Sequence, residues 1–389
     1  MVCCCKRPMH LCNVYNVLEE STVNICVKNE HITSVDNTTG SSLNIDLENA
    51  LVIPGIINSH DHLDFNSFPQ TANSIYANYT QWGRDIHQNN KTIIEAVIKI
   101  PKQLRTAWGI YKNLLAGVTT VVNHGEKLDC QNDIITVYQK GQSLHSAAFE
   151  KNWKWKLNNP FNKKKVAVIH CAEGTDAAAA AESNIIAQWN FLKRPLVAVH
   201  GVTMPAAAAV HFNSLVWCPD SNFFLLGATA RIDELKHYTN ILFGMDATLT
   251  AHWNMWEHLR LAQHTGLLSP RELMQSITTN AATAWQINTG RLTTGTEADM
   301  VILQPGKKEL NNGAVFNNNP EDILLVLHKG NIRLFDAAIK RKVAPLIDTE
   351  KFTSIIINGA EKFVYGNLPL LVKKIKAYYP DAAFPFAVN

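Results

Sequence analysis

Apolar and polar residues form short runs over the first fifty positions of the chain. Runs rich in β-branched and apolar residues cover residues 11–15, 22–28 and 31–35, and Asn, Glu and Gly separate them. Residues 37–42 are a polar stretch typical of a turn. This pattern predicts a group of short β-strands at the start of the chain.

From residue 51 onward, apolar strand-like runs alternate with helical patterns. The predicted strands cover residues 51–57, 118–123, 134–138, 143–149, 166–169, 196–199, 214–217 and 241–245. The predicted helices cover residues 92–116, an alanine-rich stretch up to about 192, 253–264 and 270–285. Such alternation is typical of parallel βα units, and enough of them over about 230 residues predict a (β/α)8 barrel. Between residues 125 and 160 the pattern does not assign the strands cleanly.

The end of the chain is strand-like again. Residues 300–303, 323–328 and 331–334 read as strands, and residues 368–379 as a terminal helix. We therefore predict an α/β protein with a TIM barrel at residues 51–290. Residues 1–50 and 291–389 are predicted to pair into one small flanking domain. A length of 389 residues suits this division, since such barrels take about 250 residues.

Composition narrows the class of protein. The chain is 46% hydrophobic and 18% charged, as ordinary globular proteins are. Its net charge of +3 gives no field that would favour nucleic acid or a membrane as partner. The eight cysteines form no disulfide framework, and no signal-peptide pattern is present. These features predict a cytoplasmic protein; for Cys3–Cys5 a mobile tail is favoured over metal binding or oxidation.

The sequence Asn58-Ser59-His60-Asp61-His62 follows the first strand of the predicted barrel. In extended chain, residues i and i+2 point to the same side, so His60 and His62 present two imidazoles to one ion. The pair alone is weak, because a chain with 15 histidines produces such spacing by chance.

Three further strand ends carry metal-competent side chains. His170, His200 and Asp246 each follow a predicted strand. Because the carboxyl ends of barrel strands meet at one rim, we expect these side chains to converge with the histidine pair. Imidazoles and a carboxylate suit Zn²⁺, Fe²⁺ or a similar ion. Such an ion lowers the pKa of bound water from about 15.7 towards about 7 and so supplies hydroxide.

Two other residues are candidates for the same rim. Glu173 lies three residues after His170, where it could pass a proton from water to a leaving group. The alternative is a carboxylate that stabilises a helix start. His124 follows the strand at residues 118–123 and is predicted to contact substrate or to be structural.

Six short motifs, in order along the chain, resemble the amidohydrolase superfamily. They are VIPGIINSHDH at 52–62, HCAE at 170–173, VHGV at 199–202, PDSN at 219–222, GRL at 290–292 and ADMV at 298–301. Within that superfamily they are similar to the one-metal branch of guanine deaminase, S-adenosylhomocysteine deaminase and chlorotriazine hydrolase. Two features depart from the pattern. Ala247 follows the last aspartate, and the segment between His62 and His170 is short.

The resemblance implies a composite β-sandwich as the flanking domain and a role for each matching residue. One divalent ion, zinc first and iron as the alternative, would be held by His60, His62, His170 and Asp246. The implied catalytic residues are Glu173 as proton shuttle, His200 as orienter of hydroxide and Asp246 as proton acceptor. The resemblance also implies that Ser221 and Asn222 shape the site near the metal. His124 and Phe223 are candidates for substrate contact from their positions, after a predicted strand and after Asn222.

The expected reaction is hydrolytic deamination of a purine-, pyrimidine- or triazine-like heterocycle, a small-molecule substrate. The alternatives are an amide or lactam hydrolase like imidazolonepropionase or dihydropyrimidinase, and a non-catalytic barrel used for assembly. A homodimer is left open. A second metal held by Glu150, Lys151 or Lys154 is disfavoured, because the HxxE motif goes with the one-metal branch.

Overall fold

The computed structural model describes residues 8–36, 43–130, 132–304 and 313–388. The predictions for Cys3–Cys5 and for the turn at residues 37–42 lie outside these residues. Along the described parts of the chain, no helix is both long enough and apolar enough to cross a lipid bilayer.

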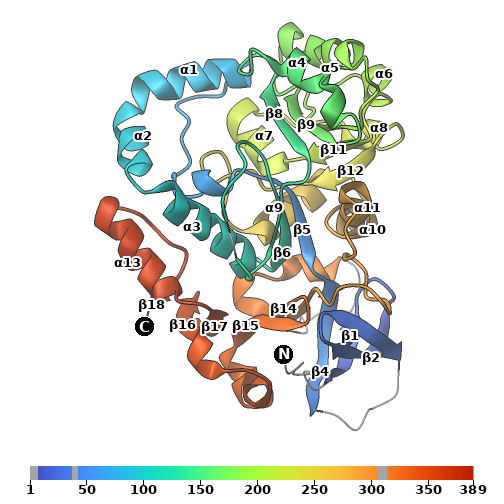
Figure 1. Cartoon of the computed structure of the whole chain (residues 1–389), viewed down its shortest axis with the longest axis vertical. Helices are drawn as coiled ribbons and strands as arrows, with labels where there is room; N and C mark the ends of the chain where they lie inside the picture. The colour runs from blue at the N-terminus through green and yellow to red at the C-terminus, as the bar shows by residue number, and fades with distance from the viewer. Residues whose placement is uncertain (1–7, 37–42, 131, 305–312, 389) are drawn as a thin grey trace.

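The two ends of the chain share one ten-stranded sheet, which Figure 1 shows below the barrel. Its order is β18-β16-β17-β15-β14-β13-β4-β1-β2-β3. The bounds are β1 Met9–Asn16, β2 Ser21–Lys28, β3 His31–Asp36, β4 Leu43–Pro54, β13 Met300–Leu303, β14 Ile323–His328, β15 Asn331–Asp336, β16 Phe352–Ile357, β17 Ala360–Tyr365 and β18 Ala387–Val388. The N- and C-terminal parts meet where β4 and β13 pair antiparallel.

Gly55 separates this sheet from the barrel. The sequence predicts a strand over residues 51–57 that Pro54 and Gly55 interrupt, and the structure has this break, since β4 ends at Pro54 and β5 (Ile56–Asp61) begins a different sheet. A Cβ atom on Gly55 would lie 2.2 Å from Thr119 Oγ1 and 2.9 Å from Asp299 Cβ. Only glycine therefore lets the chain pass between the two sheets at this point.

Eight parallel strands surround the candidate site. After β5 come β6 Val118–Asn123, β7 Thr136–Tyr138, β8 Gln142–Ser146, β9 Ala167–Cys171, β10 Leu196–His200, β11 Ser214–Trp217 and β12 Asn240–Phe243. They form two ladders, β5-β6-β7 and β8 to β12. Within the described residues no ladder joins β7 to β8 or β12 to β5. Asp246 N donates to His60 O at 3.0 Å, which ties the chain after β12 back to β5.

Apolar side chains from these strands fill the interior as a packed core. Ile57, Val122, Val168, Val216 and Leu242 belong to one buried cluster. Alternate residues of each strand point inward, so the same strands that bury these side chains also present polar residues at their carboxyl ends.

Most helices lie around the barrel strands, whereas the last two contact the ten-stranded sheet (Figure 1). Their bounds are α1 Tyr79–Asn89, α2 Lys91–Ile98, α3 Lys102–Leu115, α4 Trp153–Leu157, α5 Ala177–Trp189, α6 Ala206–Ala209, α7 Pro219–Leu226, α8 Ile232–Leu235, α9 Met255–Thr265, α10 Pro270–Ser276, α11 Thr279–Trp285, α12 Lys340–Val343 and α13 Leu368–Tyr378. The short 3₁₀ segments are η1 Leu63–Phe65, η2 Pro160–Asn162, η3 Ala314–Asn317, η4 Pro320–Asp322, η5 Ala337–Ile339, η6 Ala344–Leu346 and η7 Thr349–Lys351.

Two predicted helices are each divided. The one predicted at residues 92–116 is α2 and α3, because Pro101, with ψ of 136°, does not continue a helix. The one predicted at residues 270–285 is α10 and α11, which Thr278 separates with a non-helical backbone (φ of −133° and ψ of −97°).

Candidate metal centre

The carboxyl ends of the barrel strands bring the sequence-predicted residues together. His60 lies within β5 and His62 directly follows it, while His170 lies in β9 and His200 ends β10. Asp246 was expected to end its strand, but β12 stops at Phe243, so Asp246 lies three residues beyond it. The hydrogen bond from Asp246 N to His60 O returns its side chain to the cluster.

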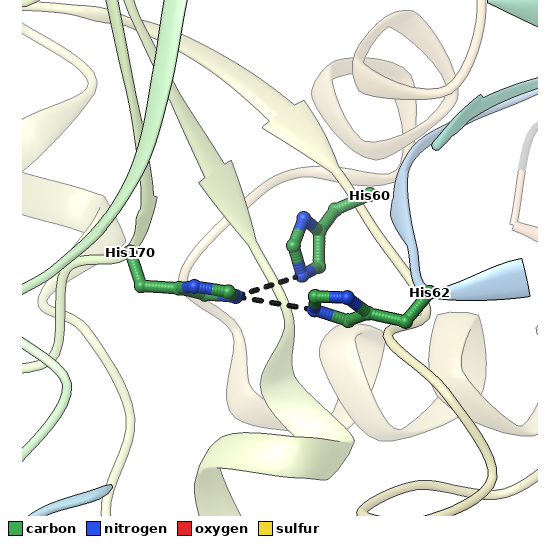
Figure 2. Close-up of side chains that lie close together, drawn as sticks. All are labelled: His60, His62 and His170. Carbon is green, nitrogen blue, oxygen red and sulfur yellow. Dashed lines mark hydrogen bonds between the residues drawn. The ribbon is translucent and has the colours of Figure 1, made fainter. Parts of the chain in front are cut away.

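Three imidazole nitrogens point at one another (Figure 2). His170 Nε2 lies 3.3 Å from His60 Nε2 and 3.4 Å from His62 Nε2. Asp246 Oδ1 lies 3.7 Å from His60 Nε2 and 3.9 Å from His62 Nε2. An ion at about 2.05 Å from each of four ligands in a tetrahedron sets them about 3.3 Å apart. His170 Nε2 lies at that spacing from the other two nitrogens, and the carboxylate is slightly farther.

Hydrogen bonds fix which atoms face the centre of this cluster. His170 Nδ1–H donates to His145 O at 2.7 Å, so its Nε2 carries the lone pair. Asp246 accepts from Ser221 Oγ at 2.8 Å, from Ala247 N at 2.8 Å and from Thr250 Oγ1 at 3.0 Å. Such contacts orient ligand atoms before an ion arrives.

The electrostatic environment also suits a cation. Burial, and then the neighbouring imidazoles, hold the pKa of His60 and of His170 well below the ordinary value, so both rings are neutral. Burial raises the pKa of Asp246, but the net pKa is lowered by His62, His200 and the hydrogen bond from Ser221. Neutral imidazoles beside an ionised carboxylate are a donor set for a divalent first-row ion.

His200 stands beside this set with one nitrogen free. Its Nδ1–H donates to Asn222 Oδ1 at 2.8 Å, and Asn222 Nδ2 donates to Thr229 Oγ1 at 3.2 Å. His200 Nε2 is buried, lies 3.6 Å from Glu173 Oε1 and has no hydrogen-bond partner in the described structure. A buried acceptor left open in this way is suited to a polar hydrogen of a ligand.

Glu173 is buried in the same cluster. Burial, then the negative charges of Asp246 and Glu182, raise the pKa of Glu173 well above its ordinary value. A carboxyl group in such surroundings binds a proton more tightly than one in water, which suits it to exchange a proton with a ligand.

Left-handed backbone occurs at three non-glycine residues of this rim. The φ angles are 53° at Ala172, 73° at His200 and 62° at Asp246. Such conformations cost about 1–3 kcal/mol each and cluster at functional sites.

Of the remaining predicted residues, three contact the cluster and one, Phe223, has no ring contact with it among the described residues. His124 is buried with its ring 4.4 Å from that of His170, and neither of its nitrogens has a partner in the described structure. Ser221 contacts Asp246, and Asn222 contacts His200. Phe223 lies half-buried on α7, and no ring contact joins it to the histidines among the described residues.

Sequence reasoning missed three residues around the cluster. The ring of His145, in β8, lies 5.4 Å from that of His170 and 5.6 Å from that of Phe149. The ring of Phe65 stacks on that of His62 at 5.5 Å. The position of Phe65 three residues after His62 was a usable signal, whereas His145 and Phe149 lie in the part that the pattern did not assign.

The side chains considered for a second metal are engaged elsewhere. Glu150 Oε1 accepts from Lys156 Nζ at 2.5 Å, and Lys154 Nζ lies 3.9 Å from the centre of the Trp189 ring. Lys151 is exposed. Among the described residues, Glu150 does not belong to the groups of side chains whose atoms could share one ion.

Comparisons with known proteins agree with this arrangement. Residues 154–333 match the model of the amidohydrolase family. No curated protein matches. An adenosine deaminase from Xanthomonas campestris with bound zinc is 16% identical, with a TM-score of 0.62 over 88% of this chain and 97% of that chain. Aminofutalosine deaminase from Helicobacter pylori, in complex with methylthio-coformycin, is 13% identical, with a TM-score of 0.63 over 84% and 100%.

A third structure is guanine deaminase from C. acetobutylicum with guanine in its active site. It is 14% identical, with a TM-score of 0.63 over 84% of this chain and 99% of that chain. These likenesses confirm the predicted α/β barrel class. Residues 154–333 are thus similar to the amidohydrolase family, and the chain shares its fold with deaminases of adenosine, aminofutalosine and guanine.

Proposed function

We propose that this protein is a metal-dependent hydrolase that deaminates a heterocyclic small molecule. The observation that carries the proposal is the convergence of His60, His62 and His170 Nε2 with Asp246, with Glu173 and His200 alongside. The family match and the deaminases of the same fold support the reaction type. A cytoplasmic location, a homodimer and the lack of a nucleic-acid partner remain predictions from the sequence.

His60, His62, His170 and Asp246 would hold one divalent ion, with zinc as the first candidate and iron as the second. When bound, such an ion polarises the substrate and lowers the pKa of water from about 15.7 towards about 7. The buried, neutral imidazoles supply lone pairs without a competing proton. The ionised Asp246 offsets the charge of the ion.

The neighbouring residues manage protons. Glu173 accepts a proton from the attacking water and delivers it to the departing nitrogen, for which a raised carboxyl pKa is suited. His200 Nε2 accepts a hydrogen bond from the water, because Asn222 holds the proton of the ring on Nδ1. Asp246 Oδ2 lies 4.0 Å from His200 Nε2. It is therefore near enough to the attacking water to accept the proton that remains after Glu173 has taken the first.

Aromatic side chains beside the cluster favour a planar substrate. Phe65 and Phe149 keep 36% and 47% of their surface exposed. The ring of Phe65 contacts that of His62, and the ring of Phe149 contacts that of His145, which lies beside His170. Exposed phenyl groups at the edge of a polar cluster offer a face on which a heterocycle can stack.

Replacing Phe149 with alanine is expected to raise KM about 2- to 12-fold with little change in kcat, since a ring pair contributes about 0.5–1.5 kcal/mol. Steady-state kinetics on the best substrate measures this. Phe161→Ala is the matched control, because Phe161 is 93% exposed on η2. An unchanged KM in Phe149→Ala would remove Phe149 from the substrate site.

The test of the function is ammonia release by purified, zinc-loaded protein from a panel of purines, pyrimidines and triazines. Ammonia from a ring amino group is the expected result. Ring opening of lactams without ammonia would favour the cyclic-amide alternative. Folded protein that neither binds metal nor hydrolyses any panel member would favour the non-catalytic barrel.

A further inference from the structure

We propose that Lys112 is a positioning residue, whose ammonium group links the two strand ends that carry His60, His62 and Asp246. The inference rests on the proposed metal-dependent function. It assigns a task to a lysine on α3, outside every motif that the sequence singled out.

Lys112 is completely buried, which is rare for a lysine. Its Nζ donates to Asp61 Oδ2 at 3.0 Å, to Asn66 Oδ1 at 3.0 Å and to Asp246 O at 3.4 Å. An ammonium group has three donors, so all three are used. The acceptors come from β5, from the turn after it and from the segment after β12.

Asp61 supports the histidine pair from the opposite side of β5. It lies between His60 and His62, and in extended chain its side chain points away from theirs. Its carboxylate also accepts from Asn66 Nδ2 and Asn113 Nδ2, each at 2.8 Å, and from Asn58 Nδ2 at 3.1 Å. This buried network fixes the part of β5 that presents both imidazoles.

The link from Lys112 to Asp246 matters because it ties the segment after β12 directly to the buried network behind the histidine pair. No strand ladder joins β12 to β5 among the described residues, and Asp246 has a left-handed φ of 62°. The attachments of this segment to the β5 side include the backbone bond to His60 O, the bond from Met245 N to Asn58 Oδ1, and Lys112. Thr248 N also donates to Asn66 Oδ1, the same atom that accepts from Lys112. Lys112 therefore contributes to the position of the Asp246 backbone, and through it of the carboxylate, relative to the imidazoles.

A purely structural role is the competing explanation. Removing one partner of a buried ion pair destabilises a protein, whereas replacing both partners is often neutral. Stability and ion affinity must therefore be measured separately. The double variant Lys112→Met with Asp61→Asn leaves no unpaired charge, so it keeps the test open if Lys112→Met alone does not fold.

The experiment measures Zn²⁺ affinity by competition with a chromophoric chelator, and melting temperature in the metal-free state. The double variant is expected to melt close to the wild type but to bind Zn²⁺ about 10- to 100-fold more weakly, as loss of supporting contacts does at metal sites. Its kcat should fall more than its KM changes, since the substrate face is intact.

Lys362→Met is the matched control. Lys362 is also completely buried and donates to Asp336 Oδ2, Glu321 O and Ile323 O, but it lies on β17, in the other sheet. This variant should melt lower and keep the wild-type Zn²⁺ affinity. If the Lys112 variants bound Zn²⁺ as tightly as the wild type, the inference about Lys112 would be wrong, whereas the proposed function would stand. Absence of Zn²⁺ binding by the wild type would overturn the proposed function and the inference with it.

Discussion

The double variant His60→Ala with His62→Ala is expected to lose bound metal and to lower kcat/KM about 10³-fold or more. The two imidazoles face His170 Nε2 at 3.3 and 3.4 Å, so their removal leaves one nitrogen and one carboxylate for the ion. Metal content by mass spectrometry and steady-state ammonia release measure the two effects.

Its control is a double variant of two exposed histidines, His87→Ala with His211→Ala. That protein should keep both metal and activity, because neither side chain belongs to the cluster. Wild-type turnover in the His60/His62 variant would reject the proposed site, whatever its melting temperature.

Replacing Glu173 with glutamine is expected to lower kcat about 10²- to 10⁴-fold while the metal content stays at the wild-type level. Glutamine keeps the shape of the side chain and cannot accept a proton from water. Glu173 is not one of the four proposed ligands, so metal content separates its role from theirs. Loss of metal in this variant would instead place Glu173 among the ligands.

The same variant has a pH-dependent effect on stability. The pKa of Glu173 is raised in the folded protein, so above the ordinary carboxyl pKa of about 4.3 the unfolded chain releases a proton that the folded chain retains. Stability is thereby lost as pH rises. Metal-free Glu173→Gln should melt above the wild type at pH 7, and the difference should vanish below about pH 4. A wild type that melts higher at pH 7 would contradict the burial of this carboxyl group.

Much of the site could be predicted because local rules determine it. The i, i+2 spacing of His60 and His62 needs only an extended chain, which β5 supplies. His170 and His200 lie at the ends of strands that their apolar runs marked. Convergence of strand ends in a barrel then brings them together.

The rest depends on contacts between distant segments, which no local pattern encodes. Asp246 lies beyond β12 and reaches the cluster through a left-handed turn and a bond to β5. Lys112 reads in sequence as an ordinary helical lysine, although α3 buries it against Asp61. The strands β7 and β8 were hard to assign because they are only three and five residues long, and no helix separates them from β6 among the described residues.

The most direct test of the account is a crystal structure of zinc-loaded protein with anomalous data collected on both sides of the zinc absorption edge. The account predicts one strong anomalous peak within about 2.0–2.2 Å of His60 Nε2, His62 Nε2, His170 Nε2 and a carboxylate oxygen of Asp246. A peak bound by other side chains, or none at this position in protein shown to contain zinc, would contradict it.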